Sequence, residues 1–279
     1  MPIENIPEIY LPKRTERPDL FVYDFKMTND VVKSKVNLSM NMFSFLQVGK
    51  KQVHFAGNSI AVNKDQSLLL KKGNWLWTEL LETEAIYYCK LFFFSEKPLK
   101  KFLEKHAVNK VLGQEITPYF CIQNDAYIGS YLNSLSTIVN SPTVFPENLL
   151  SVKFEELMLY LIQKYGLKFE LYLHSLIANE SSSFKQIIEN NIHSNLRLEE
   201  IAFLCHMSLS TFKRHFINEY KVSPGKWFQD KRLQKAKEIL EEGHLKASDI
   251  YFEIGYNNLS NFSIAFKNKF GIRPTDLSK

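Results

Sequence analysis

The side chains best suited to chemistry in this sequence are two adjacent cations in a helical stretch that holds few acids. Lys213 and Arg214 stand between Phe212 and Phe216, whose spacing of four places both aromatic rings on one helix face. The two cations therefore face elsewhere, and no acid precedes Glu219 in this stretch. Arginine and lysine can donate hydrogen bonds to O6 and N7 of guanine, so this face favours nucleic-acid recognition.

The elements that must position these cations follow from residues that cap and break helices. Ser208 is suited to the N-cap, where its hydroxyl can accept a hydrogen bond from a first-turn amide. Pro224 suits the first turn of a helix, where its missing N–H costs nothing. A tight break is expected at His206-Met207, and Gly243 ends the helix that begins at Pro224. The sequence predicts helices over residues 184–191, 198–205, 209–220 and 224–241.

The same pattern then recurs further along the chain. A short helix is expected over 248–254, followed by a turn at Gly255 and a helix over 258–270, in which Phe262 and Phe266 again stand four apart. A short helix, a turn and a second helix pinned by aromatic rings make a helix-turn-helix. The helix over 224–241 would be about 27 Å long and could set two such units about one DNA turn, near 34 Å, apart.

Residues 184–277 resemble the DNA-binding domain of the AraC/XylS family. The resemblance rests on Ser208-Leu209-Ser210-Thr211-Phe212-Lys213-Arg214, Ser223-Pro224, and the run from Asp249 to Phe262 that continues through Phe266-Lys267 to Gly271-Ile272-Arg273-Pro274. Tyr251 departs from the family, which often has a small alanine there. The resemblance implies a sequence-specific transcription regulator, interpreted as an activator, with promoter DNA and RNA polymerase as partners.

The resemblance also implies which residues contact DNA. Base contacts are expected from Ser210, Lys213, Arg214, Leu259, Ser260, Ser263 and Ile264. Phosphate contacts are expected from Thr211, Lys226, Asn258, Asn261 and Lys267. Two alternatives stay open. Lys213 and Arg214 could contact phosphates alone, and the second unit could either touch thymine methyls through its apolar side chains or mainly hold phosphates.

The N-terminal part predicts a different architecture. Short strands with turns about every ten residues indicate an antiparallel sandwich or barrel over about 20–95, and helices are expected over about 97–175. The expected fold class is α+β. By its similarity to the family's sensing domain, the part over 1–178 is expected to be a cupin-like antiparallel β-barrel with helices that senses or dimerises, followed by a linker at 179–183 and an all-α double helix-turn-helix domain over 184–279. The apolar stripe of 147–165 could face the core or form the seam of a homodimer.

Aromatic residues in the predicted barrel suggest a second site. Trp75, Trp77, Phe92 and Phe94 could line a pocket for a small apolar ligand, or could simply fill the core. A regulatory protein acting on this domain is the other form of control that the sequence leaves open.

Composition argues against several other functions. The three cysteines lie far apart, and the predicted barrel holds one histidine, His54, which favours neither a metal site nor a cofactor. An enzyme, such as a catalytic cupin, is therefore the disfavoured alternative. No signal peptide or membrane span is indicated, so a cytoplasmic protein is expected. The net charge of +5 is mild, and residues 180–279 carry +3 of it.

Overall fold

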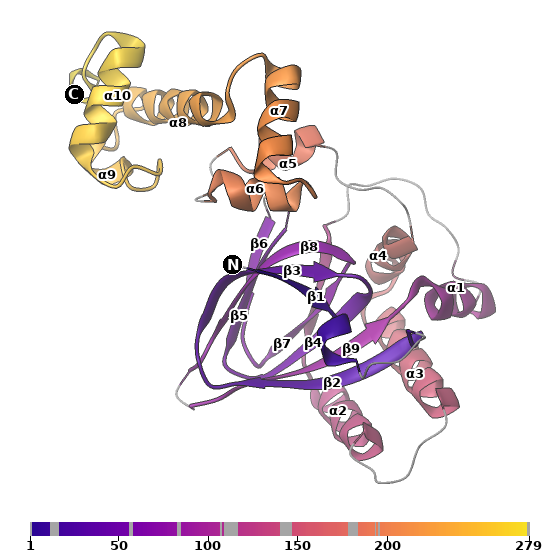
Figure 1. Ribbon diagram of the computed structural model, residues 1–279. Helices are drawn as coiled ribbons and strands as arrows, with labels where there is room; N and C mark the ends of the chain where they lie inside the picture. The colour runs from indigo at the N-terminus through magenta and orange to yellow at the C-terminus, as the bar shows by residue number, and fades with distance from the viewer. Residues whose placement is uncertain are drawn as a thin grey trace. The chain divides into compact units, whose positions relative to one another are not determined.

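The computed structural model describes residues 2–11, 17–55, 58–82, 85–106, 108, 117–139, 147–177, 184–192, 194 and 196–277. The chain divides into two compact units, Met1–Ser181 and Ser182–Lys279, which Figure 1 labels element by element. The predicted linker at 179–183 lies outside the described residues.

The first unit contains two five-stranded sheets. The first sheet has the order β1 (Ile3–Ile6), β3 (Val31–Leu38), β8 (Gly73–Leu80), β5 (Lys50–Phe55), β6 (Asn58–Val62). The second has the order β10 (Tyr119–Gln123), β7 (Gln66–Leu70), β4 (Asn41–Val48), β9 (Tyr87–Phe94), β2 (Leu20–Met27). Neighbours are antiparallel except β1 and β3, which are parallel. The expected α+β class is confirmed, with two open sheets in place of one closed barrel.

The inner strands of the second sheet are buried on both faces. One face contributes Met42, Leu46, Leu68, Leu70, Leu91 and Phe93 to the core shared with the first sheet. The other face contributes Phe43, Phe45, Leu69, Phe92 and Phe94 to a core shared with helices. Side chains alternate between the faces of a strand, so burial on both sides requires the continuous apolar runs seen in these strands.

In the described part of this unit, the strands are accompanied by the 3-10 helix η1 (Glu8–Tyr10) and four α-helices: α1 (Glu96–Lys105), α2 (Ala126–Val139), α3 (Glu147–Tyr165) and α4 (Leu167–Ile177). In α3 the apolar stripe of Phe154, Leu157, Met158 and Leu161 is buried in the core with the second sheet. The core interpretation of this stripe therefore accounts for it, since these side chains are not available to a second chain.

The four aromatic residues expected to line one pocket lie in two separate cores. Trp75 and Trp77 pack between the sheets, whereas Phe92 and Phe94 point to the helices on the far side of the second sheet. The two pairs therefore do not line one shared cavity, because Phe92 and Phe94 lie on the face of the second sheet that meets the helices. The alternative, that these rings fill the interior, describes them better: all four are almost fully buried.

A buried ion pair links residues that are distant in sequence within the first unit. The Lys51 Nζ lies 2.7 Å from the Glu79 carboxylate, and both side chains are almost fully buried. The Tyr87 hydroxyl donates to the same carboxylate at 3.0 Å, and Lys51 lies 3.8 Å from the centre of the Trp77 ring. Each charge is partnered, so the cluster joins the two sheets without leaving an unpaired ion in the core.

The second unit is helical. Its elements are α5 (Phe184–Asn190), α6 (Leu198–Leu204), α7 (Leu209–Tyr220), α8 (Pro224–Glu241), α9 (Ala247–Ile250), α10 (Leu259–Phe270) and the 3-10 helix η2 (Pro274–Asp276). The helix expected over 248–254 is shorter, because residues 251–255 form turns. Among the described residues of the chain, no helix is long and apolar enough to span a membrane.

Candidate nucleic-acid interface

The turns before α7 and α10 have the same hydrogen-bond pattern. After α6, Met207 N donates to Ala202 O and His206 N donates to Phe203 O, both at 2.9 Å. After α9, Tyr256 N donates to Tyr251 O at 3.0 Å and Gly255 N donates to Phe252 O at 2.9 Å. In each turn, one bond joins residues five apart in sequence and the other joins residues three apart within that span. This is the Schellman motif, which ends a helix. The chain thus reverses twice by one mechanism.

The two turns place different residue types in the left-handed conformation, and this difference allows a test of the turn geometry. His206 has φ +57°, and Gly255 has φ +88°. Only glycine adopts such angles without a steric cost. We expect Gly255→Ala to lower the free energy of unfolding by about 1 kcal/mol. We expect His206→Gly to raise it by about 0.5 kcal/mol, since the freedom of glycine in the unfolded chain offsets part of the gain. Urea unfolding of both variants measures this, and shifts of equal sign would contradict it.

Each second helix begins at a polar cap. The Ser208 hydroxyl accepts from Thr211 N at 3.2 Å, and the Asn258 side-chain oxygen accepts from Asn261 N at 2.8 Å. These bonds satisfy first-turn amides that have no partner within the helix. Both second helices therefore start where capping residues in the sequence predict.

Paired phenylalanines hold both second helices in place. Phe212 and Phe216 are fully buried, as are Phe262 and Phe266, and the ring centres within each pair lie 5.7 Å apart. One helix, α8, serves both cores. Its first half packs Phe228 against Phe216, and its second half supplies Leu233, Ala236 and Leu240 to the core around Phe262 and Phe266.

The opposite face of α7 is open to solvent. Ser210, Lys213 and Arg214 are exposed there, three or four residues apart, so they form one stripe on the helix. Thr211 differs from them, since it is half-buried and its hydroxyl accepts from Ser208 Oγ at 2.9 Å. Its predicted phosphate contact therefore competes with a role in the cap.

In α10 the corresponding positions follow at an offset of fifty residues. Ser260 and Ile264 are exposed, Leu259 less so, and Ser263 is half-buried. Ile264 stands where α7 has Arg214 and exposes 60% of its surface. We call the exposed face of α7 (Ser210, Lys213 and Arg214) and that of α10 (Leu259, Ser260 and Ile264) the two reading faces, after the role predicted for them; α7 presents hydrogen-bond donors there, while α10 presents two apolar side chains.

The predicted phosphate contacts lie around these faces. Lys226 is exposed in the first turn of α8, and Asn261 and Lys267 are exposed on α10. Asn258 is exposed as well. Its side-chain oxygen accepts the capping hydrogen bond, so only its side-chain nitrogen is left to donate to a phosphate.

The structure adds one residue that the sequence interpretation missed. Ile217 is exposed on α7, four residues after Lys213 and at the position that corresponds to Lys267 in α10. The fifty-residue offset between the two units is the signal that would have found it, because each exposed position in one unit has a counterpart in the other.

The acid at the end of α7 is neutralised. Glu219 lies 2.7 Å from Lys185 of α5, and this hydrogen bond lowers the pKa of the Glu219 carboxyl. On α8, Glu238 and Glu241 lie 3.8 Å and 3.5 Å from lysines of the same helix. The uncompensated charge near the reading face of α7 is therefore that of its cations.

Polar contacts also fix the two helix-turn-helix units to α8. Arg232 donates to Ser194 O at 2.9 Å, and Lys269 of α10 lies 3.3 Å from the Asp230 carboxylate. Gln229 donates to the Tyr256 hydroxyl at 3.4 Å. Both units are thus anchored near the middle of one continuous helix.

Two domain families match the chain. Residues 41–172 match the family described as the ExsA N-terminal regulatory domain, and residues 201–279 match a helix-turn-helix domain. The match over 201–279 covers α7, α8 and α10, where the duplicated geometry lies.

Individual relatives agree with these matches. The virulence regulon transcriptional activator VirF of Yersinia enterocolitica is 30% identical over 132 residues, which are 47% of this chain and 49% of VirF. The regulator ExsA of Pseudomonas aeruginosa is 28% identical over 131 residues, 47% of each chain. This chain thus spans about half the length of these relatives. An apo ToxT variant from Vibrio cholerae shares 15% identity over 94% of this chain and 98% of ToxT, with a TM-score of 0.42.

A sheet-rich unit followed by two helix-turn-helix motifs on one connecting helix defines a class: the two-domain helix-turn-helix regulators. Within that class, the two matched domains and the relatives named above are those of AraC-family transcriptional regulators, which this chain resembles.

Proposed function

We propose that this chain is a sequence-specific DNA-binding transcription activator that places α7 and α10 in successive major grooves of a promoter. The observation that carries the proposal is the duplicated motif, in which paired buried phenylalanines turn one face of each helix toward solvent. The 18 residues of α8 correspond to about 27 Å, which suits two recognition helices one DNA turn apart.

The two helices would contribute differently to recognition. Lys213 and Arg214 supply the donors that guanine accepts, and Ser210 lies on the same stripe. Leu259 and Ile264 would contact thymine methyls, with Ser260 and Ser263 beside them. Phosphates would be held by Lys226, Asn261, Lys267, the Asn258 amide and, where its cap allows, Thr211.

We extend the proposal to the activation of transcription and to its control. VirF is named an activator, which supports RNA polymerase as a partner of this chain in the cytoplasm. Because the relatives above are named as regulators, a non-enzymatic role is favoured. Control through the sheet-rich unit, by a small ligand or by a regulatory protein, and pairing as a homodimer belong to the same proposal.

Selection of binding sites from random duplex DNA tests the proposed function. The full chain should enrich a motif with two blocks of specified bases about one helical turn apart, and mobility shifts with the enriched duplex should show at least about a thousandfold preference over a scrambled one. Recovery of no motif from several rounds would contradict sequence-specific binding. A single block would contradict the role of α10.

The phosphate contacts predict a change in salt dependence. Lys226→Gln and Lys267→Gln should each weaken binding to all sequences alike and reduce the slope of log K against log salt by about 1. Lys235→Gln is the matched control, because Lys235 lies nine residues along α8 from Lys226, on the opposite side of the helix. If Lys235→Gln changed the slope as much as Lys226→Gln, the assignment of this face would be wrong.

A further inference from the structure

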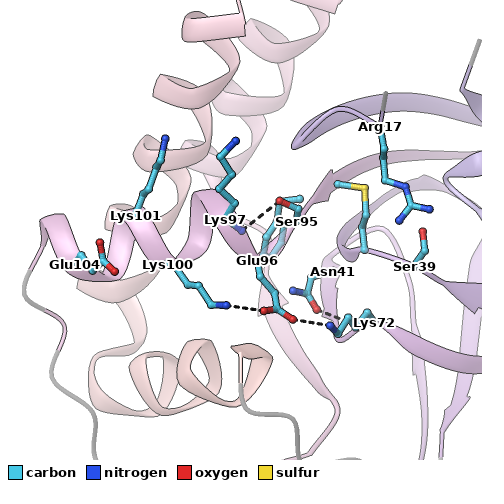
Figure 2. Close-up of a pocket in the computed structure, with 12 residues that line it drawn as sticks. Arg17, Ser39, Asn41, Lys72, Ser95, Glu96, Lys97, Lys100, Lys101 and Glu104 are labelled. Carbon is cyan, nitrogen blue, oxygen red and sulfur yellow. Dashed lines mark hydrogen bonds and ion pairs between the residues drawn. The ribbon is translucent and has the colours of Figure 1, made fainter. Parts of the chain in front are cut away.

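A pocket of about 520 Å³ opens in the first unit beside the N-terminal end of α1. Its walls come from the beginning of β4, the turn between β7 and β8, the end of β9 and the first turns of α1 (Figure 2). The volume is in the range of sites that hold small molecules. None of the DNA-contacting residues proposed above lies in this unit.

Cations exceed carboxylates around this pocket. Its lining holds two acids, Glu96 and Glu104, and five bases: Arg17, Lys72, Lys97, Lys100 and Lys101. Just outside the lining, Glu8 pairs with Arg17 and Asp19 lies 2.9 Å from Lys97. With these two acids counted, one positive charge remains in excess, which matches a ligand that carries one negative charge.

Glu96 does not prevent an anion from binding. Its carboxylate lies 2.5 Å from Lys72 and 2.9 Å from Lys100, and Figure 2 shows it between the two. Hydrogen bonds from both lysines lower the pKa of Glu96. Because one carboxylate serves two lysines, this trio is itself net positive.

A buried amide nitrogen without a partner faces the same pocket. Asn41 is 1% exposed, and its oxygen accepts from Lys72 N at 2.9 Å. Its Nδ2 has no hydrogen-bond partner within the described part of the chain. Figure 2 shows this nitrogen turned away from Lys72 and into the pocket. A buried donor without a partner costs about 1–3 kcal/mol. A ligand oxygen that accepts a hydrogen bond from this nitrogen would remove that cost and so bind more tightly.

Two further features define the ligand. The helix α1 runs for ten residues from its cap at Ser95, and the N-terminal end of a helix favours negative charge. Met40 and Phe94, both buried, supply apolar surface to the lining. The site therefore combines a place for one carboxylate group with a place for a small apolar body.

We propose that this pocket binds a small organic carboxylate. One carboxylate oxygen accepts from Asn41 Nδ2, the net positive trio of Lys72, Glu96 and Lys100 supplies the attracting charge together with Lys101, and the apolar body lies against Met40 and Phe94. The inference is independent of DNA binding, since it concerns the first unit alone and is measured without DNA.

Calorimetric titration of the full chain with benzoate tests the site. Benzoate should bind saturably with one equivalent by about 5 mM, whereas benzyl alcohol, which lacks the charge, and acetate, which lacks the ring, should bind at least about tenfold more weakly. Phenyl phosphate, with its larger charge, should bind more weakly than benzoate. Absence of saturable benzoate binding, or equal binding of benzyl alcohol, would overturn the proposal. Tighter binding of phenyl phosphate would overturn the carboxylate assignment.

Variants locate the binding. Asn41→Asp keeps the acceptor for Lys72 N and replaces the free donor with an anionic oxygen, so benzoate affinity should fall at least about tenfold. Lys101→Gln, at an exposed position, should weaken it about threefold without affecting folding. Lys105→Gln is the matched control, an exposed lysine of the same helix that lies outside the pocket. Equal affinity in Lys101→Gln and Lys105→Gln, with circular dichroism unchanged, would show that benzoate binds elsewhere.

Discussion

Replacing Arg214 by alanine should weaken the sequence preference of this protein by about 5- to 150-fold while leaving its fold intact. Arg214 is exposed on α7, next to Lys213 and away from the buried Phe212 and Phe216. A bidentate arginine–guanine pair contributes about 1–3 kcal/mol of discrimination. Affinity for the selected duplex should therefore fall by about 5- to 150-fold, toward the affinity for scrambled DNA. Mobility shifts on the two duplexes measure both values.

Two further substitutions separate the possible roles of Arg214. Arg214→Lys keeps the positive charge and loses the planar pair of donors, so it should also lose discrimination if the side chain contacts a base. Retention of the preference in Arg214→Lys would assign the residue to a phosphate. Arg273→Ala is the matched control, because the side chain of Arg273 is 70% exposed beyond the end of α10. An unchanged site preference in Arg214→Ala would refute its role in reading bases.

Replacing Phe262 by alanine should destabilise the second helix-turn-helix by about 3–5 kcal/mol, the usual cost of removing a buried phenylalanine. The ring is fully buried and packs with Phe266 and the second half of α8. Ile264, two residues away, exposes 60% of its surface. Ile264→Ala should therefore change the free energy of unfolding by less than about 0.5 kcal/mol.

Both substitutions should impair DNA binding, but for different reasons. Ile264→Ala should remain folded yet lose preference at one block of the selected site, while Phe262→Ala should lose binding together with structure. Urea unfolding followed by circular dichroism, combined with mobility shifts, distinguishes the outcomes. If Ile264→Ala retained full preference at every base, α10 would hold the DNA through phosphates alone.

The sequence predicts the helical unit well because its signals are local. The caps at Ser208 and Asn258, the proline at 224 and the paired phenylalanines each act within a few residues, and the bounds of α7, α8 and α10 follow from them. The end of α9 is less certain from sequence, because residues up to 254 retain a helical pattern although the chain turns from Tyr251 onward.

The sheet-rich unit is harder to predict because its contacts are not local. A run such as Leu91–Phe94 shows that a strand is buried, but it does not show which face meets helices and which meets the other sheet. For this reason the sequence does not show that Trp75 and Trp77 lie in one core while Phe92 and Phe94 lie in the other. The pairing of Lys51 with Glu79 likewise depends on a strand register between segments 28 residues apart. The arrangement of Asn41 beside α1 depends on the same kind of long-range packing.

The continuity of α8 ties the spacing of the two recognition helices to whole helical turns. One residue inserted near its middle would rotate the second helix-turn-helix by about 100° while moving it only about 1.5 Å, which turns its reading face off the duplex. Seven inserted residues would restore the phase of α8 to within about 20°, but they would lengthen the span by about 10.5 Å, close to three base pairs, over which the major groove itself turns by about 100°. The length of α8 therefore ties this protein to one spacing of its two DNA blocks, because a short insertion cannot match the helix phase and the groove phase together.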